Sequence, residues 1–159
     1  MICLGIFYYT YSKENISFKK AMGRHRFPVV VLYNNGNAYN FIVDTGATNS
    51  VLNKNFLDLI KHNKIETEDC TLYGIDGNPI SVEYIEVPLY NGKKKFTEDF
   101  QVIDVPAFDK LKETENLEVA GFLGSSFLEK NKMSIDFKKY EIKVSRKIFL
   151  AISNDLFCN

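Results

Sequence analysis

Asp44 is the residue in this sequence best placed to do chemistry. It ends an apolar run, residues 41–43, and the small residues Thr45, Gly46 and Ala47 follow at once. A carboxylate at the end of a buried strand is costly unless hydrogen bonds support it. Gly46 allows close backbone approach, Thr45 supplies a hydroxyl, and Ala47 leaves room for a ligand. The pattern indicates a carboxylate held in a tight turn with backbone N–H groups aimed at it, although Asp also begins ordinary turns.

The elements that must position this turn read mainly as β-strands. Residues 27–33 and 38–43 are rich in β-branched and aromatic side chains, and Asn35-Gly36 lies in the turn between them. Two such runs around Asn-Gly predict a hairpin. A second hairpin is predicted around Asp76-Gly77, with arms at residues 71–75 and 78–85. Asp44 therefore follows the second strand of the first hairpin.

The rest of the chain continues the β pattern, with little helix. Further strands are expected at residues 1–9, 85–90, 96–102, 133–137 and 140–144. Helical spacing favours a helix over residues 54–60, and a short one is expected over residues 125–130 with Ser125 as its N-cap. Residues 105–119 look like an exposed loop. The expected fold is mostly β with one or two short helices.

The composition excludes several classes of function. The chain has 159 residues, is 45% hydrophobic, and carries 20 Lys and Arg against 20 Asp and Glu, so its formal net charge is zero. This length suits one globular domain. A nucleic-acid-binding protein would normally show a basic excess. Zero net charge also leaves no electrostatic barrier to self-association.

The cysteines and the apolar stretches indicate the cellular compartment of the protein. Cys3, Cys70 and Cys158 form no C-x-x-C pair, which disfavours zinc and indicates free thiols in a reducing compartment. His25 and His62 are too few and too distant for a nucleophilic triad. No run approaches 18 apolar residues, so no membrane span is expected. The apolar start lacks a basic flank and a cleavage signal. These observations together predict a cytoplasmic protein, with secretion as the alternative if the sequence is a truncated one.

Residues 41–52 resemble the active-site loop of the aspartic proteases, in which two apolar residues precede Asp-Thr/Ser-Gly-Ala/Ser. Residues 120–128 are similar to the apolar-apolar-Gly element and short helix near the end of retroviral-type proteases. Residues 133–137 look like the strand that follows that helix, and the hairpin around Asp76 occupies the place of the flap. The chain holds one Asp-Thr-Gly, whereas pepsin-like enzymes carry two in a chain of about twice this length. The resemblance is therefore to the single-domain, retropepsin-like branch.

The resemblance implies a closed, barrel-like acid-protease fold of one lobe that works as a homodimer on an extended peptide. Each subunit would give Asp44 to a shared site, where one carboxylate activates water and the other polarises the scissile carbonyl. Thr45 would hydrogen-bond across the dimer, Gly46 would contact the substrate backbone, and Ala47 completes the loop. No cofactor or metal is implied. Further roles fall to the flap residues Gly74, Ile75, Asp76 and Gly77, and to Leu123 and Gly124 as structural support.

The resemblance also divides the chain. It covers residues 27–144 as the protease domain, with an N-terminal extension at residues 1–26 and a C-terminal extension at residues 145–159. The extensions could build the dimer interface, or they could occlude the cleft. Asp76 near the flap tip could alter substrate choice, or simply face solvent in its Asp-Gly turn.

Two other functions fit parts of the sequence. Residues 43–50 also look like the first phosphate loop of the actin and heat-shock-protein ATPases, but that fold needs two lobes and more than twice this length. The second alternative is a catalytically weak module of the same fold that dimerises or binds peptides, because fold alone does not establish function.

Overall fold

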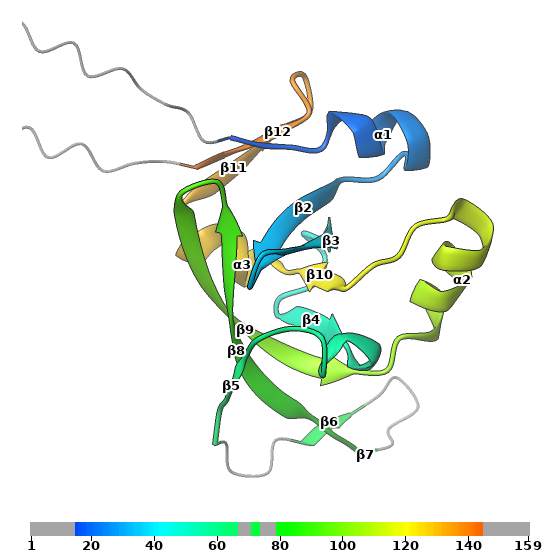
Figure 1. Ribbon diagram of the computed structural model, residues 1–159, viewed down its shortest axis with the longest axis vertical. Coiled ribbons are helices and arrows are strands. Elements are labelled where there is room, and N and C mark those ends of the chain that lie inside the picture. Colours follow the sequence, from blue (N-terminus) through cyan, green and yellow to red (C-terminus); the bar gives the residue numbers. More distant parts are fainter. Residues whose placement is uncertain (1–14, 67–70, 74–78, 145–159) are drawn as a thin grey trace, which may run out of the picture.

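The computed structural model describes residues 15–66, 71–73 and 79–144 (Figure 1). These residues form mainly short strands, joined by few helices. In chain order the elements are β1 (Ile16–Ser17), α1 (Lys19–His25), β2 (Val29–Asn34), β3 (Asn37–Val43), β4 (Ser50–Asn53), the 3₁₀ helix η1 (Lys54–Phe56), β5 (Asn63–Lys64), β6 (Thr71–Tyr73), β7 (Pro79–Ser81), β8 (Glu83–Asn91), β9 (Lys94–Ile103), α2 (Pro106–Glu115), β10 (Gly121–Leu123), α3 (Ser125–Lys130), β11 (Met133–Asp136) and β12 (Glu141–Val144).

Six strands close into a barrel. Their order is β2-β3-β10-β4-β9-β8, and the pairing of Tyr33 with Tyr90 joins β8 back to β2. The pairs β3–β10 and β4–β9 are parallel, whereas the other contacts around the barrel are antiparallel. The predicted mostly β, closed, barrel-like architecture is therefore confirmed.

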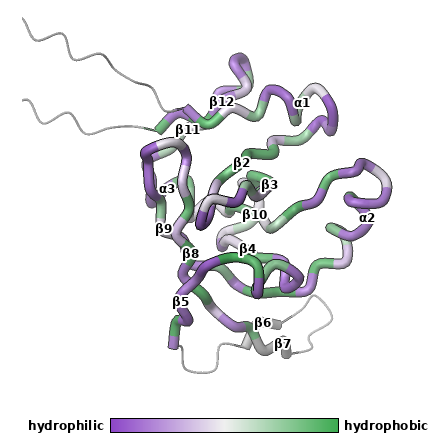
Figure 2. Tube along the Cα trace, in the orientation of Figure 1, coloured by the Kyte–Doolittle hydropathy of each residue, from purple (hydrophilic) through white to green (hydrophobic). Residues whose placement is uncertain are grey.

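The core fills the inside of this barrel. Alternate residues of each strand point inward, as the period of two in a strand requires. In β2, for example, Val30 and Leu32 are fully buried while Val31 is exposed. Figure 2 shows the hydrophobic character of β2 along most of its length. The largest fully buried side chains include Phe41, Leu52, Ile85, Leu89, Phe100 and Leu123.

The first hairpin forms as predicted. β2 pairs with β3 from Val29 opposite Ile42 to Asn34 opposite Asn37, so Asn35 and Gly36 alone make the connection. Both have positive φ, 48° and 84°. Positive φ at both central residues is the type I′ turn that matches the twist of a hairpin, which is why Asn-Gly is favoured there.

The arms of the second hairpin also pair. β6 and β7 are antiparallel, with Thr71 opposite Ser81 and Tyr73 opposite Pro79. The predicted two-residue Asp76-Gly77 turn would place Tyr73 opposite Ile80, so the observed register differs from the prediction by one residue. The tip itself, with Gly74, Ile75, Asp76 and Gly77, lies outside the described residues, as do the strand predicted at residues 1–9 and the extension at 145–159.

One helix is confirmed and one is shorter than expected. α3 covers Ser125–Lys130, as predicted. The prediction of Ser125 as its N-cap is wrong, because Gly124 occupies that position and the Ser125 hydroxyl donates instead to the Ala47 carbonyl at 3.1 Å. The helix expected over residues 54–60 is reduced to η1 and a following turn, in which the Ile60 N–H donates to the Phe56 carbonyl.

The prediction of a loop over residues 105–119 is wrong, because this segment contains α2. Pro106 occupies its first turn, where the missing N–H costs nothing, and Asn116 ends it with left-handed backbone. α2 is mainly hydrophilic (Figure 2), and Phe108 is its one buried side chain. The Phe108 ring lies 4.7 Å from that of Phe122, measured between centroids. α2 therefore covers the outer side of β10 through a second, smaller core.

Residues 15–26 pack against the barrel. β1 pairs with β12, which also pairs with β11, to form a three-stranded sheet. Ile16 and Phe18 are buried in the main core, and the Phe18 ring meets Phe137 and Tyr140 edge-on. α1, which the sequence did not predict, follows this contact. No helix in the described ranges has the length and apolar character needed to cross a membrane.

Candidate active site

The Asp44 loop is held by a strand from the other end of the domain. β10 lies between β3 and β4, the two strands that the loop connects. Leu123 is in parallel register with Val43, and Phe122 is in antiparallel register with Val51. Both flanks of the loop are thereby fixed to the same short strand. Gly121 is required at its start, because an added Cβ would lie 2.1 Å from the Val51 carbonyl oxygen.

The backbone around Asp44 is anchored on both sides. Its N–H donates to the Leu123 carbonyl at 3.0 Å, and its own carbonyl accepts the Ala47 N–H at 3.3 Å. The carboxylate Oδ1 accepts the Gly46 N–H at 2.9 Å. Oδ2 has no donor within the described part of the chain. Among the described residues, the loop thus holds one carboxylate oxygen, and no donor holds the other.

The loop presents its tip to solvent. Asp44 is half-buried, whereas Thr45 and Gly46 are exposed. The strand that leads to Asp44 is buried at Phe41 and Val43, so its apolar side chains anchor the loop in the core. An acid on a fixed backbone at the end of a barrel strand is accessible to a substrate or to a second protein surface.

The first turn of α3 supports the far side of the loop. The Ser125 N–H donates to the Ala47 carbonyl at 2.8 Å, and the Ser126 N–H donates to the Thr48 carbonyl at 3.0 Å. Gly124 must be glycine, because an added Cβ would lie 2.7 Å from the Thr48 carbonyl oxygen and 2.6 Å from that of Asn49. Loop and helix are therefore in direct backbone contact.

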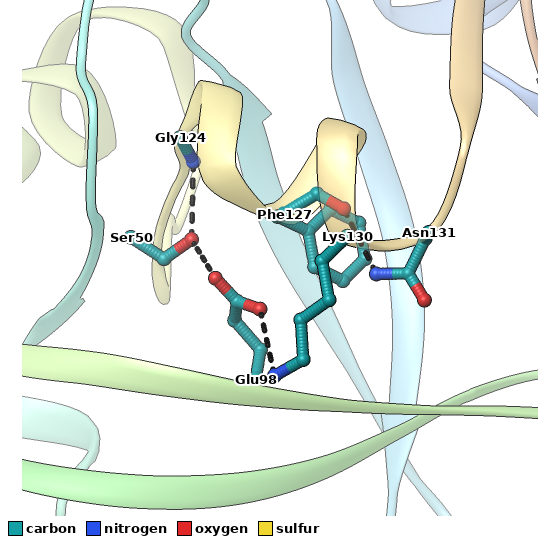
Figure 3. A network of polar contacts seen from close by, with 6 residues as sticks. All are labelled: Ser50, Glu98, Gly124, Phe127, Lys130 and Asn131. Atoms are coloured by element: carbon teal, nitrogen blue, oxygen red, sulfur yellow. Dashed lines mark hydrogen bonds and ion pairs between the residues drawn. The ribbon is translucent and has the colours of Figure 1, made fainter.

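A buried polar network lies beneath this contact (Figure 3). The Ser50 hydroxyl donates to Glu98 Oε1 at 2.8 Å and accepts the Gly124 N–H at 3.1 Å. Lys130 Nζ lies 3.8 Å from Glu98 Oε2. Burial raises the pKa of Glu98, while the Ser50 hydrogen bond and the Lys130 charge act in the opposite direction and the Asp99 charge raises it further.

Sequence reasoning missed Glu98, although a signal was present. Phe96, Glu98 and Phe100 alternate along β9 and share its inward face. A charged residue that interrupts such an apolar alternation must find partners in the core. Its partners Ser50 and Lys130 come from β4 and α3, so the sequence alone does not name them.

The structure brings together Asp44, Thr45, Gly46 and Ala47 with Leu123 and Gly124, all of which the sequence singled out. The flap residues 74–77 lie outside the described ranges. Among the residues that the structure describes, no three His, Cys, Asp or Glu side chains gather in a way that could hold a metal ion.

Solved structures of similar architecture include the following two proteins. One is the EIAV protease complexed with the inhibitor HBY-793, at 19% identity and a TM-score of 0.48 over 67% of this chain and 88% of that one. The other is the retroviral protease-like domain of Ddi1 from Leishmania major, at 18% identity and a TM-score of 0.49 over 76% and 89%. No protein-family model matches the chain, and neither does any curated protein sequence. The chemistry assigned to the Asp44 loop therefore rests on its own residues and geometry.

Proposed function

We propose that this chain is an aspartic-type endopeptidase that acts as a homodimer, with Asp44 of each subunit in one shared site. The observation that carries the proposal is the Asp44 loop. Its carboxylate is held at Oδ1 by the Gly46 N–H, and its tip is open to solvent. One subunit supplies one such carboxylate, whereas this route of peptide hydrolysis uses two. A two-fold axis beside the exposed loop would supply the second.

The chemistry of the pair follows from charge repulsion. Two carboxylates within hydrogen-bond reach cannot both ionise at low cost, so they share one proton. The ionised Asp44 takes a proton from water, and the water oxygen attacks the scissile carbonyl carbon. The protonated Asp44 gives its proton to the carbonyl oxygen, which yields a tetrahedral diol. When the diol collapses, the ionised carboxylate takes a hydroxyl proton, the C–N bond breaks, and the protonated carboxyl group gives its proton to the leaving nitrogen, so the pair again shares one proton.

The neighbouring residues have supporting roles in this proposal. Thr45 hydrogen-bonds across the dimer and fixes the geometry of the pair, while Gly46 approaches the substrate backbone. The substrate in this proposal is an extended peptide that lies against the loop, and Gly74, Ile75, Asp76 and Gly77 keep the flap role that the resemblance implies. Main-chain hydrogen bonds to such a peptide would supply affinity, and side-chain pockets would supply selectivity.

The test is cleavage of a diverse peptide mixture, read by mass spectrometry, together with the oligomeric state at micromolar concentration. Asp44→Asn should keep the dimer and lower the cleavage rate by roughly 10²–10⁴-fold. Asp58→Asn is the matched control, because it removes an exposed carboxylate outside the loop. Cleavage by Asp44→Asn at the wild-type rate would reject the mechanism. A wild-type dimer that binds peptides without cutting them would instead indicate the binding module.

A further inference from the structure

Glu98 is a carboxylate on the core face of β9. It is 3% exposed, and Phe96 and Phe100 on either side of it are 2% and 0% exposed. An apolar residue at this position would avoid the cost of burying a charge. Where a chain departs from an otherwise consistent apolar pattern, the exception tends to mark a functional site.

The contacts of Glu98 show what the carboxylate does. A serine hydroxyl has one proton to donate, and Ser50 gives it to Glu98 Oε1 at 2.8 Å. The lone pairs of Ser50 Oγ are thereby left to accept the Gly124 N–H, at 3.1 Å. The charged groups near the carboxylate are Lys130 of α3, 3.8 Å from Oε2, and the exposed Asp99 next to it in β9. Glu98 therefore sets the direction in which the Ser50 hydroxyl points.

The chain of contacts continues to Asp44. Gly124 directly follows Leu123, whose carbonyl accepts the Asp44 N–H at 3.0 Å. We infer that Glu98 is a positioning residue for Asp44, acting through Ser50 and the backbone of Leu123 and Gly124. As a catalytic role this inference rests on the proposed function, but the positioning itself is a property of the fold and can be measured without a substrate.

The first experiment measures amide hydrogen exchange in the full chain. In Glu98→Leu the Ser50 hydroxyl loses its acceptor. The exchange rates of the Gly124 and Gly46 amides, each divided by that of the barrel amides, should therefore be about tenfold higher than in wild type. Glu98→Gln keeps an oxygen that can accept and should stay within about threefold of wild type. Gln101→Leu is the control, because it removes a buried polar side chain of the same strand whose Nε2 donates to Tyr84 instead. If Glu98→Leu fails to fold, Ser50→Ala tests the same contact.

The second experiment measures peptide cleavage by the same variants. Glu98→Leu should lower kcat by about tenfold or more with little change in KM, because the reacting carboxylate is displaced while the binding surface is kept. Glu98→Gln should restore most of this loss, and Gln101→Leu should cleave at the wild-type rate. Equal exchange at Gly124 in Glu98→Leu and Gln101→Leu would overturn the inference. A wild type that cleaves nothing, but shows the predicted exchange pattern, would reject the proposed function and leave the positioning role intact.

Discussion

The backbone N–H of Asp44 donates a 3.0 Å hydrogen bond to the carbonyl of Leu123. This bond continues the parallel pairing of β3 with β10 one residue beyond the last strand residue, Val43. The carboxylate therefore leaves the barrel from a backbone that is still held by sheet-type hydrogen bonding. A loop anchored in this way can hold a reactive side chain in a fixed position at little further entropic cost.

The proposed sharing of Asp44 between subunits predicts how mixed dimers behave. When wild type and Asp44→Asn are mixed in equal amounts and allowed to exchange, about one quarter of the dimers should hold two aspartates. Cleavage activity should then fall to about one quarter of that of wild type at the same total concentration. If each subunit contained a whole site, the mixture would keep about one half of the wild-type cleavage activity. Titration of the variant into wild type therefore decides between a shared site and a site within one subunit.

Gly124→Ala should destabilise the domain by about 1–3 kcal/mol or more, because its Cβ meets the backbone of Thr48 and Asn49. Urea unfolding measures this change. Gly23→Ala is the matched control, since nothing lies within 4 Å of its added Cβ and it belongs to α1. There the substitution should be neutral or stabilising by about 0.5–1 kcal/mol. If both variants lowered the free energy of unfolding equally, the close contact at Gly124 would not be the cause of the destabilisation.

The raised pKa of Glu98 predicts a stability that depends on pH. The folded chain keeps the Glu98 proton at pH values where the unfolded chain has already lost it, from about 4.5 upward. The free energy of unfolding should therefore fall as pH rises from 4.5 through the raised pKa of Glu98. Glu98→Gln should remove this part of the slope. Urea unfolding at a series of pH values measures this dependence. The prediction would be contradicted if the free energy of unfolding changed with pH equally in wild type and in Glu98→Gln.

Asn34 joins the first hairpin to two other segments. Its Nδ2 donates to the carbonyls of Lys61 and Pro88 at 2.9 and 2.8 Å, and its Oδ1 accepts the Lys61 N–H at 2.7 Å. Because the residue is buried, Asn34→Ala should cost about 2–4 kcal/mol in thermal or urea unfolding. Asn37→Ala, at the exposed position opposite it in the hairpin, should change stability by less than about 0.5 kcal/mol. A small loss at Asn34 would mean that water replaces these bonds.

Local chemistry made several elements predictable. The hairpin at Asn35-Gly36 depends on two adjacent residues that accept positive φ, so sequence alone identifies it. α2 was missed because half of its ten residues are charged and only Phe108 is buried, which leaves almost no apolar periodicity to detect. The burial of Phe108 depends on Phe122, which belongs to a strand further along the chain.

The sequence by itself determined the mostly β character, the hairpin before Asp44 and the composition of the Asp44 loop, because these depend on neighbouring residues. Only the tertiary structure decided that β10 enters between β3 and β4, that Gly124 lies against Thr48 and Asn49, and that Ser50 meets Glu98. Each of these contacts joins residues far apart in the chain. Their pairing depends on how the whole barrel closes and packs, a non-local choice that local sequence patterns do not encode.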